Sequence, residues 1–196
     1  MYVIKEAGKK YEEISLSEWT SRLERCLLPL NPIPQGGDYW AGVAAILTLD
    51  KEVLLVKRAV RPGDPWSGDW AMPGGKWRKG DANLYESIKR EVMEETSIDI
   101  SSLRPAGWLP PRSPRISPEM KIMPLILLTS SRLKIVLNDE LTDYCWVSLT
   151  SLVCEKRVMK TSRGEELTDV YLLDETNVVW GITARIIQEL IDRAGL

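Results

Sequence analysis

The chain has 196 residues, of which 44% are hydrophobic and 28% charged, and its formal net charge is −2. This composition is that of an ordinary globular domain with enough apolar surface for a core, and the charge excludes the broad basic field that attracts nucleic acid. The chain has no histidine, which excludes histidine-based nucleophile systems and histidine-ligated metals, and its three cysteines form no CxxC pair that would indicate a zinc knuckle.

The first predicted element is an amphipathic helix over residues 15–30. Apolar side chains recur there at helical spacing, and Ser15 with Glu18 forms a capping box at its start. We expect this helix to pack on the body of the protein or on a dimer partner. It ends before NPIPQGG, so residues 1–34 are predicted to be an N-terminal helical extension and residues 35–196 the main domain.

No segment of the sequence is suited to crossing a membrane. The longest apolar run, at 41–49, is too short, and the first residues, MYVIKEAGKKYEE, lack the apolar core of a signal peptide. Widely spaced cysteines fit free thiols in a reducing compartment. We therefore expect a cytoplasmic protein without a membrane partner.

Strands and helices alternate through the main domain. Two strands, 39–49 and 52–59, flank a tight turn, and the segment 60–70 is rich in proline and glycine and is predicted to be a loop. The remaining patterns predict, in chain order, a short strand and a glycine turn at 70–81, a helix at 84–96, an irregular excursion or broken strand pair at 103–120, strands at 121–130 and 141–149, a short helix at 148–156, a strand at 169–174 and a closing helix at 179–196. This alternation predicts an α/β sandwich.

Three glutamates gather in the predicted helix at 84–96. At about 100° per residue, Glu95 falls in line with the apolar stripe that includes Ile88, and Glu91, Glu94 and Glu95 share an arc of roughly 100°. Burying an unpaired carboxylate is costly, and like charges three or four residues apart on a helix repel. The cluster therefore requires a positive partner.

Arg90 is one such partner, but one arginine does not neutralise three or four acids. Hard divalent cations prefer carboxylate oxygens, and Mg²⁺ is commonly shared with substrate phosphates. The pattern favours a metal site. The alternative is a helix whose acids are all paired at the surface.

The residues before this helix are suited to phosphate. Gly74 and Gly75 allow a tight turn and a close approach of the backbone to a ligand. Asp81 is placed to cap the helix, although it is also a candidate metal ligand. A helix N-terminus with Lys76 and Lys79 beside it suits phosphate oxygens. Together with the glutamates, this order of features predicts a site for a phosphate-bearing substrate.

The segment GKWRKGDANLYESIKREVMEETSI, residues 75–98, resembles the signature of Nudix hydrolases, G-x5-E-x7-R-E-U-x-E-E-x-G-U, in which U is apolar. The matching positions are Gly75, Arg90, Glu91, Val92, Glu94, Glu95 and Ile98. Three positions depart from the pattern. The first acid is Asp81 rather than glutamate, one extra residue separates it from Arg90, and Ser97 replaces the glycine that usually ends the helix.

The extra residue makes the box similar to that of coenzyme A pyrophosphatases. The upstream segment RPGDPWSGDWAMPGG and the closing VVWGITARIIQELI are also similar to bacterial proteins near that subgroup, so the resemblance spans residues 43–190. Met72 stands where the subgroup usually has phenylalanine, and only Asp69 is available as the acid of its upstream motif.

The resemblance implies a Nudix-type α/β/α sandwich with a mixed sheet and a loop–helix–loop box. It implies hydrolysis of a nucleoside diphosphate derivative with Mg²⁺ or Mn²⁺, and it favours coenzyme A or a related ADP derivative as the substrate. The alternatives are ADP-ribose or a nucleoside triphosphate, and a catalytically weak binding module of the same fold. The implied roles are catalysis by Arg90, Glu91, Glu94 and Glu95, and metal ligation by these three glutamates and Gly75.

Residues outside the box complete the candidate site. Arg58 and Arg61, like Gly74, Gly75 and Lys76, are candidates for binding the diphosphate, and a solvated rim is the alternative for the two arginines. Further side chains are weighed between substrate contact and packing or solvation: Trp66, Trp70, Trp77, Arg112 and Arg115.

The catalytic base stays open at this point. Without histidine, a carboxylate or the metal must prepare the water. The candidates are Glu119, Glu140 and a metal-bound hydroxide.

Overall fold

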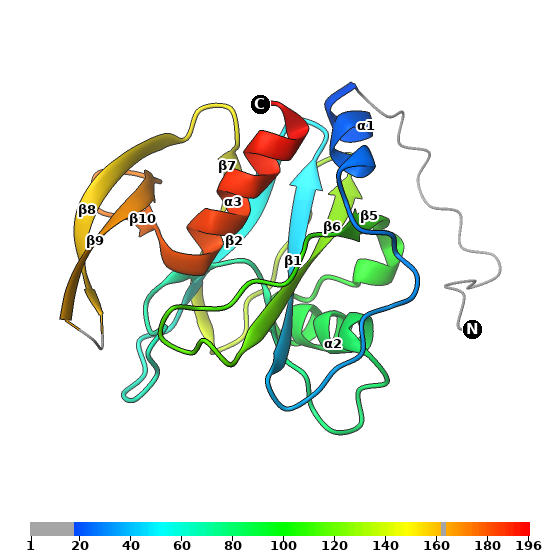
Figure 1. Cartoon of the computed structure of the whole chain (residues 1–196), viewed down its shortest axis with the longest axis horizontal. Helices are drawn as coiled ribbons and strands as arrows, with labels where there is room; N and C mark the ends of the chain where they lie inside the picture. The colour runs from blue at the N-terminus through cyan, green and yellow to red at the C-terminus, as the bar shows by residue number, and fades with distance from the viewer. Residues whose placement is uncertain (1–17, 162–163) are drawn as a thin grey trace.

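The computed structural model describes residues 18–161 and 164–196, in which strands and helices alternate as the sequence patterns predict (Figure 1). The helices are α1 (Glu18–Arg25), α2 (Leu84–Thr96), α3 (Gly181–Ala194) and the short 3-10 helix η1 (Ile100–Ser102). The strands are β1 (Trp40–Thr48), β2 (Glu52–Arg58), β3 (Trp70–Ala71), β4 (Gly74–Lys76), β5 (Arg104–Trp108), β6 (Lys121–Thr129), β7 (Leu141–Ser148), β8 (Val153–Thr161), β9 (Gly164–Leu172) and β10 (Val178–Val179).

The main sheet is mixed and is built around β1. Its order is β3-β2-β1-β6-β5, with β4 also paired to β1 and β7 to β2. The β1 and β6 strands run parallel, in register along all nine residues of each, while the other pairs are antiparallel. Central strands covered on both faces read as nearly continuous apolar runs, which is why both strands were recognisable in the sequence.

Helices cover both faces of this sheet. Successive side chains of a strand point to opposite faces, so Ala44 and Ile46 pack with α2 in one core, whereas Ala45 and Leu47 pack with α1 and α3 in the other. The α/β/α sandwich with a mixed sheet is therefore confirmed. A second, three-stranded sheet, β10-β9-β8, lies beside α3 and apart from α2 (Figure 1).

The helix that carries the glutamates has the predicted bounds, but its cap is not the predicted residue. Asn83 is the N-cap, and its side chain accepts a hydrogen bond from the Glu86 N–H at 3.1 Å. Asp81 lies two residues before this cap and pairs with arginine instead, so the prediction that it caps the helix was wrong. Ser97 ends the helix with φ 60, the left-handed conformation that glycine usually supplies.

The N-terminal helix is shorter than the predicted 15–30 span. Its capping box begins at Ser15, which lies outside the described residues. The helix ends at Arg25, because Leu28 precedes a proline, which disfavours helical backbone, and pairs with Trp108 of β5 instead. Trp19 is buried in the core beside α3, so α1 packs on the body of the chain.

The prediction of a short helix at 148–156 was wrong. The segment is a turn after β7 followed by the start of β8, which pairs with β9 from Val153 opposite Leu172 to Thr161 opposite Gly164. Pairing with a distant strand overrides weak local preference. The strand predicted at 169–174 is accordingly the end of the longer β9.

The proline-rich segment 103–120 is a broken strand pair, one of the two predicted outcomes. β5 pairs with β6 through a register shift near Gly107, and Arg112 then forms an isolated bridge with Ile122. No helix in the described residues is long and apolar enough to cross a membrane.

Candidate active site

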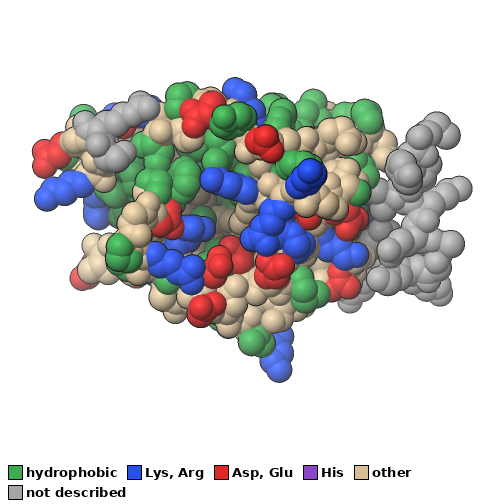
Figure 2. Space-filling model, turned by 90° about the horizontal axis from the view of Figure 1, so that it is seen from below, with side chains coloured by type: hydrophobic (Ala, Val, Ile, Leu, Met, Phe, Trp, Pro, Cys, Tyr) green, Lys and Arg blue, Asp and Glu red, His purple; other side chains and the backbone are tan. Residues whose placement is uncertain are grey.

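A cavity of about 1000 Å³ opens between the start of β1, β4, α2, the loop before β3 and the first turn of α3. Figure 2 shows this face hollowed, with hydrophobic side chains inside the hollow and both acidic and basic side chains along its edge. Glu91 and Glu95 of α2 line the cavity together with Gly74 and Gly75 of β4. The structure thus brings two of the three predicted glutamates and the glycine pair to one wall.

Close packing of β4 on β1 and α2 requires both glycines. A Cβ on Gly74, whose φ is 141, would lie 2.3 Å from the Gly42 carbonyl oxygen of β1. A Cβ on Gly75 would lie 2.6 Å from the carboxyl carbon of Glu91. The Gly74 N–H donates to Glu95 Oε2 at 2.8 Å. The missing side chains therefore let the two carboxylates lie against the backbone.

Both of these carboxylates are buried, as the helical geometry predicts. Glu95 is only 4% exposed and Glu91 only 7%. Burial raises the pKa of Glu95 to about 7, the Gly74 N–H opposes this rise, and the charge of Glu91 adds to it. If Glu91 and Glu95 are both ionised, their negative charges are therefore not fully balanced by neighbouring donors.

Arginines compensate Glu91 and Glu94 in part. Arg90 Nη1 lies 2.6 Å from Glu91 Oε1 and 3.5 Å from Glu94 Oε2. Arg78, which the sequence patterns did not single out, lies 3.2 Å from Glu91 Oε1 and 3.9 Å from Glu94 Oε2. Asp81 in turn accepts hydrogen bonds from Arg90 at 2.9 and 3.1 Å, and these bonds hold the pKa of Asp81 at about 2.

The donor chemistry fits a divalent cation, although the three glutamates do not converge. Within residues 18–161 and 164–196, no three His, Cys, Asp or Glu side chains gather closely enough to hold a metal ion. The Glu94 side chain is half-exposed and turned toward the arginines. Glu91 and Glu95, with the Gly75 backbone beside them, offer the oxygen ligands that Mg²⁺ and Mn²⁺ prefer. Because both carboxylates are buried, a positive charge beside them would be favourable.

The residues predicted to bind substrate divide into two groups. Arg58 lines the cavity, and its buried Nε has no hydrogen-bond partner in the described part of the chain. Lys76 also lines the cavity and is exposed. Arg61 instead lies on the rim, half-exposed, with Asp139 and Glu140 each 3.8 Å away.

The other weighed residues divide in the same way. Glu140 lines the cavity, and its charge acts on Glu95. Glu119 is exposed and is not among the described residues that line the cavity. Arg115 lines the cavity and pairs with Glu166 of the second sheet, whereas Arg112 is bound to Glu189 of α3.

The three tryptophans have different surroundings. Trp66 lines the cavity and is half-buried. Trp70 also lines it but is 6% exposed, and its Nε1 donates to Asn177 at 3.1 Å. Trp77 donates to the Asp81 carbonyl at 3.0 Å. Trp66 is therefore the indole with the most freedom to meet a substrate.

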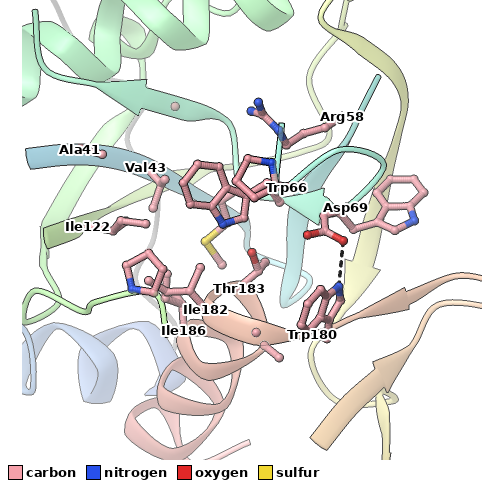
Figure 3. Close-up of a pocket in the computed structure, with 18 of the residues that line it drawn as sticks. Ala41, Val43, Arg58, Trp66, Asp69, Ile122, Trp180, Ile182, Thr183 and Ile186 are labelled. Carbon is pink, nitrogen blue, oxygen red and sulfur yellow. Dashed lines mark hydrogen bonds between the residues drawn. The ribbon is translucent and has the colours of Figure 1, made fainter. Parts of the chain in front are cut away.

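Sequence reasoning did not predict a link between Asp69 and α3. The Trp180 Nε1–H donates to Asp69 Oδ1 at 2.8 Å across the cavity (Figure 3). Burial raises the pKa of Asp69, an effect that the bond from Trp180 opposes. Asp69 lies in the upstream segment and Trp180 in the closing segment, the two stretches whose sequences are similar to proteins near the coenzyme A pyrophosphatases. That shared similarity was the only sequence signal that linked the two residues.

Comparisons with known proteins agree with this geometry. The profile of the NUDIX domain matches residues 38–169. The uncharacterised Nudix hydrolases NudL of Yersinia enterocolitica and Photorhabdus laumondii are 25% and 26% identical to the chain, covering 93% and 90% of it and 94% and 96% of their own lengths.

Solved structures share the fold. A MutT/nudix family protein from Enterococcus faecalis aligns with a TM-score of 0.51 at 20% identity, covering 100% of this chain and 76% of that one. A bifunctional NMN adenylyltransferase/ADP ribose pyrophosphatase from Francisella tularensis aligns with a TM-score of 0.52 at 18% identity, covering 90% of this chain and 46% of that one. With the profile matching about two thirds of its length, the chain belongs to the Nudix family and is a diphosphate hydrolase.

Proposed function

We propose that this enzyme cleaves the diphosphate linkage of coenzyme A or a related ADP derivative, with Mg²⁺ or Mn²⁺ held by Glu91, Glu95 and Gly75, and by Glu94, which would have to turn from Arg78 and Arg90 to reach the ion. The observation that carries the site is the pair of buried carboxylates, Glu91 and Glu95, on the wall of the large cavity. A bound divalent cation supplies neutralisation of the diphosphate charge and polarisation of the bond that breaks.

The chain's own residues supply position and proton transfer. Arg90, fixed by its paired hydrogen bonds to Asp81, orients Glu91. The partly exposed guanidinium of Arg58 lines the cavity and binds a phosphate oxygen. Glu140 lies on the same cavity and takes the proton from the attacking water. Positioning and electrostatics carry most of the acceleration in phosphoryl-transfer chemistry.

Coenzyme A is favoured by the similarity of the box, the upstream segment and the closing helix to its pyrophosphatases. A cavity of about 1000 Å³ has room for a long substrate. ADP-ribose and nucleoside triphosphates are the alternatives within the family, and the Francisella fold neighbour contains an ADP ribose pyrophosphatase. The three free thiols of the chain support our proposal of a reducing, cytoplasmic compartment.

A catalytically weak binding module is the alternative from another class. It would have no use for two buried, incompletely compensated carboxylates, which cost stability. The observed burial therefore favours catalysis.

A mass-resolved screen tests the proposal. The purified protein is incubated with Mg²⁺ or Mn²⁺ and coenzyme A, ADP-ribose, diadenosine polyphosphates or nucleoside triphosphates. Coenzyme A is expected to give a phosphopantetheine fragment and adenosine 3′,5′-bisphosphate. Glu95→Gln should lose most of the turnover, and the matched control Glu119→Gln, outside the cavity, should keep it. A kcat/KM for ADP-ribose or a triphosphate higher than that for coenzyme A would show that coenzyme A is not the preferred substrate. The absence of turnover with every substrate would favour the binding module.

A further inference from the structure

The cavity has a second region, beyond the carboxylates, with a different character. Figure 3 shows Val43 and Ile122 on one side of it and Ile182 and Ile186 of α3 below. Met72 adds a further apolar lining side chain. This region suits a group of the substrate that has apolar surface.

The loop before β3 is hydrogen-bonded so that it presents Trp66 to this region. Asp64 accepts the Trp66 N–H at 3.0 Å through one oxygen and pairs with Arg58 at 2.7 Å through the other. The hydroxyl of Ser67 accepts the Arg61 N–H at 2.6 Å. The Trp66 side chain therefore projects from a braced loop and faces the cavity (Figure 3).

Asp69 places a hydrogen-bond acceptor in the same region. One of its carboxyl oxygens accepts the Trp180 N–H at 2.8 Å. Among the described residues, no other side chain donates a hydrogen bond to this carboxyl. The other oxygen faces the cavity between Trp66 and Thr183 (Figure 3). A carboxylate accepts hydrogen bonds and repels phosphate. A ligand group suited to the second oxygen therefore carries an N–H or O–H donor.

Arg58 connects the two regions of the cavity. Its backbone N–H donates to the Asp69 carbonyl at 3.0 Å, and its guanidinium pairs with Asp64 of the loop that carries Trp66. Arg58 lines the same cavity as Glu95 and Asp69. A diphosphate at Arg58 would extend its nucleoside toward Asp69 and Trp66.

We propose that this region binds an aromatic ring bearing an amino group, an aminopurine or aminopyrimidine base, with Trp66 as the stacking surface and Asp69 as the specificity-determining acceptor for the amino N–H. The inference rests on the proposed function, since the base belongs to the nucleoside diphosphate substrate. Stacking on an indole accepts any flat base. The amino preference comes from Asp69, because a half-buried, charged acceptor discriminates against a ring that offers no donor.

Trp180 makes the effect of substituting Asp69 directional. In Asp69→Asn, the amide oxygen stays opposite the Trp180 N–H, and the NH₂ group takes the place of the oxygen that faced the cavity. The variant then offers a donor instead of an acceptor. Its base preference should change sign, which a loss of packing alone would not produce.

Binding of matched nucleotides tests the inference without turnover. AMP is compared with 6-methoxypurine riboside 5′-monophosphate, and CMP with its 4-methoxy analogue, by calorimetry without divalent metal. Each methoxy analogue replaces the amino donor by an acceptor. We expect the wild type to bind at least one amino nucleotide about 10-fold or more tightly than its analogue, since hydrogen bonds to charged groups are strong. Asp69→Asn should lose or invert that preference, Trp180→Phe should weaken it, and Asp139→Asn, on the exposed rim, should keep it.

Equal binding within both pairs by the wild type would overturn the inference, as would an unchanged preference in Asp69→Asn. The outcome is separable from the proposed function. Amino preference without hydrolysis of any diphosphate would overturn the proposed hydrolysis and support the base subsite. Hydrolysis with no amino preference would overturn the subsite alone.

Discussion

Replacing Glu95 by glutamine should stabilise the metal-free protein at alkaline pH. The pKa of Glu95 is about 7, against an ordinary value of 4.5. Because one pKa unit corresponds to about 1.4 kcal/mol, ionising Glu95 in the folded state costs about 3 kcal/mol. Below pH 4.5 the carboxyl is protonated in both folded and unfolded chains and this cost is absent. The cost grows as the pH rises from the ordinary pKa of 4.5 to the folded pKa of about 7, and it is constant above that. Glu95→Gln avoids this cost while its amide oxygen still accepts the Gly74 N–H.

The assay is thermal unfolding in EDTA between pH 5 and pH 8. For a chain of this size, about 3 kcal/mol corresponds to a rise in Tm of about 6–12 °C at pH 8 and little change at pH 5. Glu94→Gln is the matched control, because that side chain is half-exposed. Added Mg²⁺ should raise the Tm of the wild type more than that of Glu95→Gln. A Tm of Glu95→Gln at or below that of the wild type at pH 8, or a difference independent of pH, would refute the reasoning.

Three further substitutions test separate parts of the site. Arg58→Gln should raise KM by about 10-fold or more, because hydrogen bonds to charged groups contribute about 1.5–3 kcal/mol, whereas Arg61→Gln on the rim should change it by no more than about two-fold; equal effects would contradict the division of the two arginines. Glu140→Gln should remove the rising limb of the pH–rate profile and Glu119→Gln should keep it, in profiles recorded with Mg²⁺ and with Mn²⁺. A limb that survives in Glu140→Gln and moves with the metal would exclude Glu140 as the base. Gly75→Ala should lower kcat by about 10-fold or more, since its Cβ would lie 2.6 Å from a carboxyl carbon; an unchanged kcat would show that the wall tolerates a side chain.

Local periodicity predicted the parts of the site that lie on one helix. Turning α2 by a fixed angle per residue placed Glu95 in the apolar stripe and Glu94 at the edge of the arc, and the structure buries the first and leaves the second half-exposed. The central strands were equally recognisable, because covered parallel strands are continuously apolar.

Features that depend on distant contacts were not predictable in this way. β8 is stabilised by its pairing with β9, and the sequence of residues 148–156 does not by itself predict a strand. Arg78 reaches Glu91 only through the path of the loop after β4. The bond between Asp69 and Trp180 joins residues 111 positions apart. Each of these needs the tertiary fold, which composition and spacing do not contain.

The position of Trp66 and Asp69 has an evolutionary consequence. Both stand on the loop before β3, whereas the carboxylates stand on α2, whose apolar stripe packs into the core through Leu84 and Ile88. Changes in the loop can therefore accumulate without disturbing the helix that bears the carboxylates. Descendants of one ancestral sequence can therefore change the group that the loop recognises by altering a few loop positions, while the hydrolytic chemistry is inherited intact.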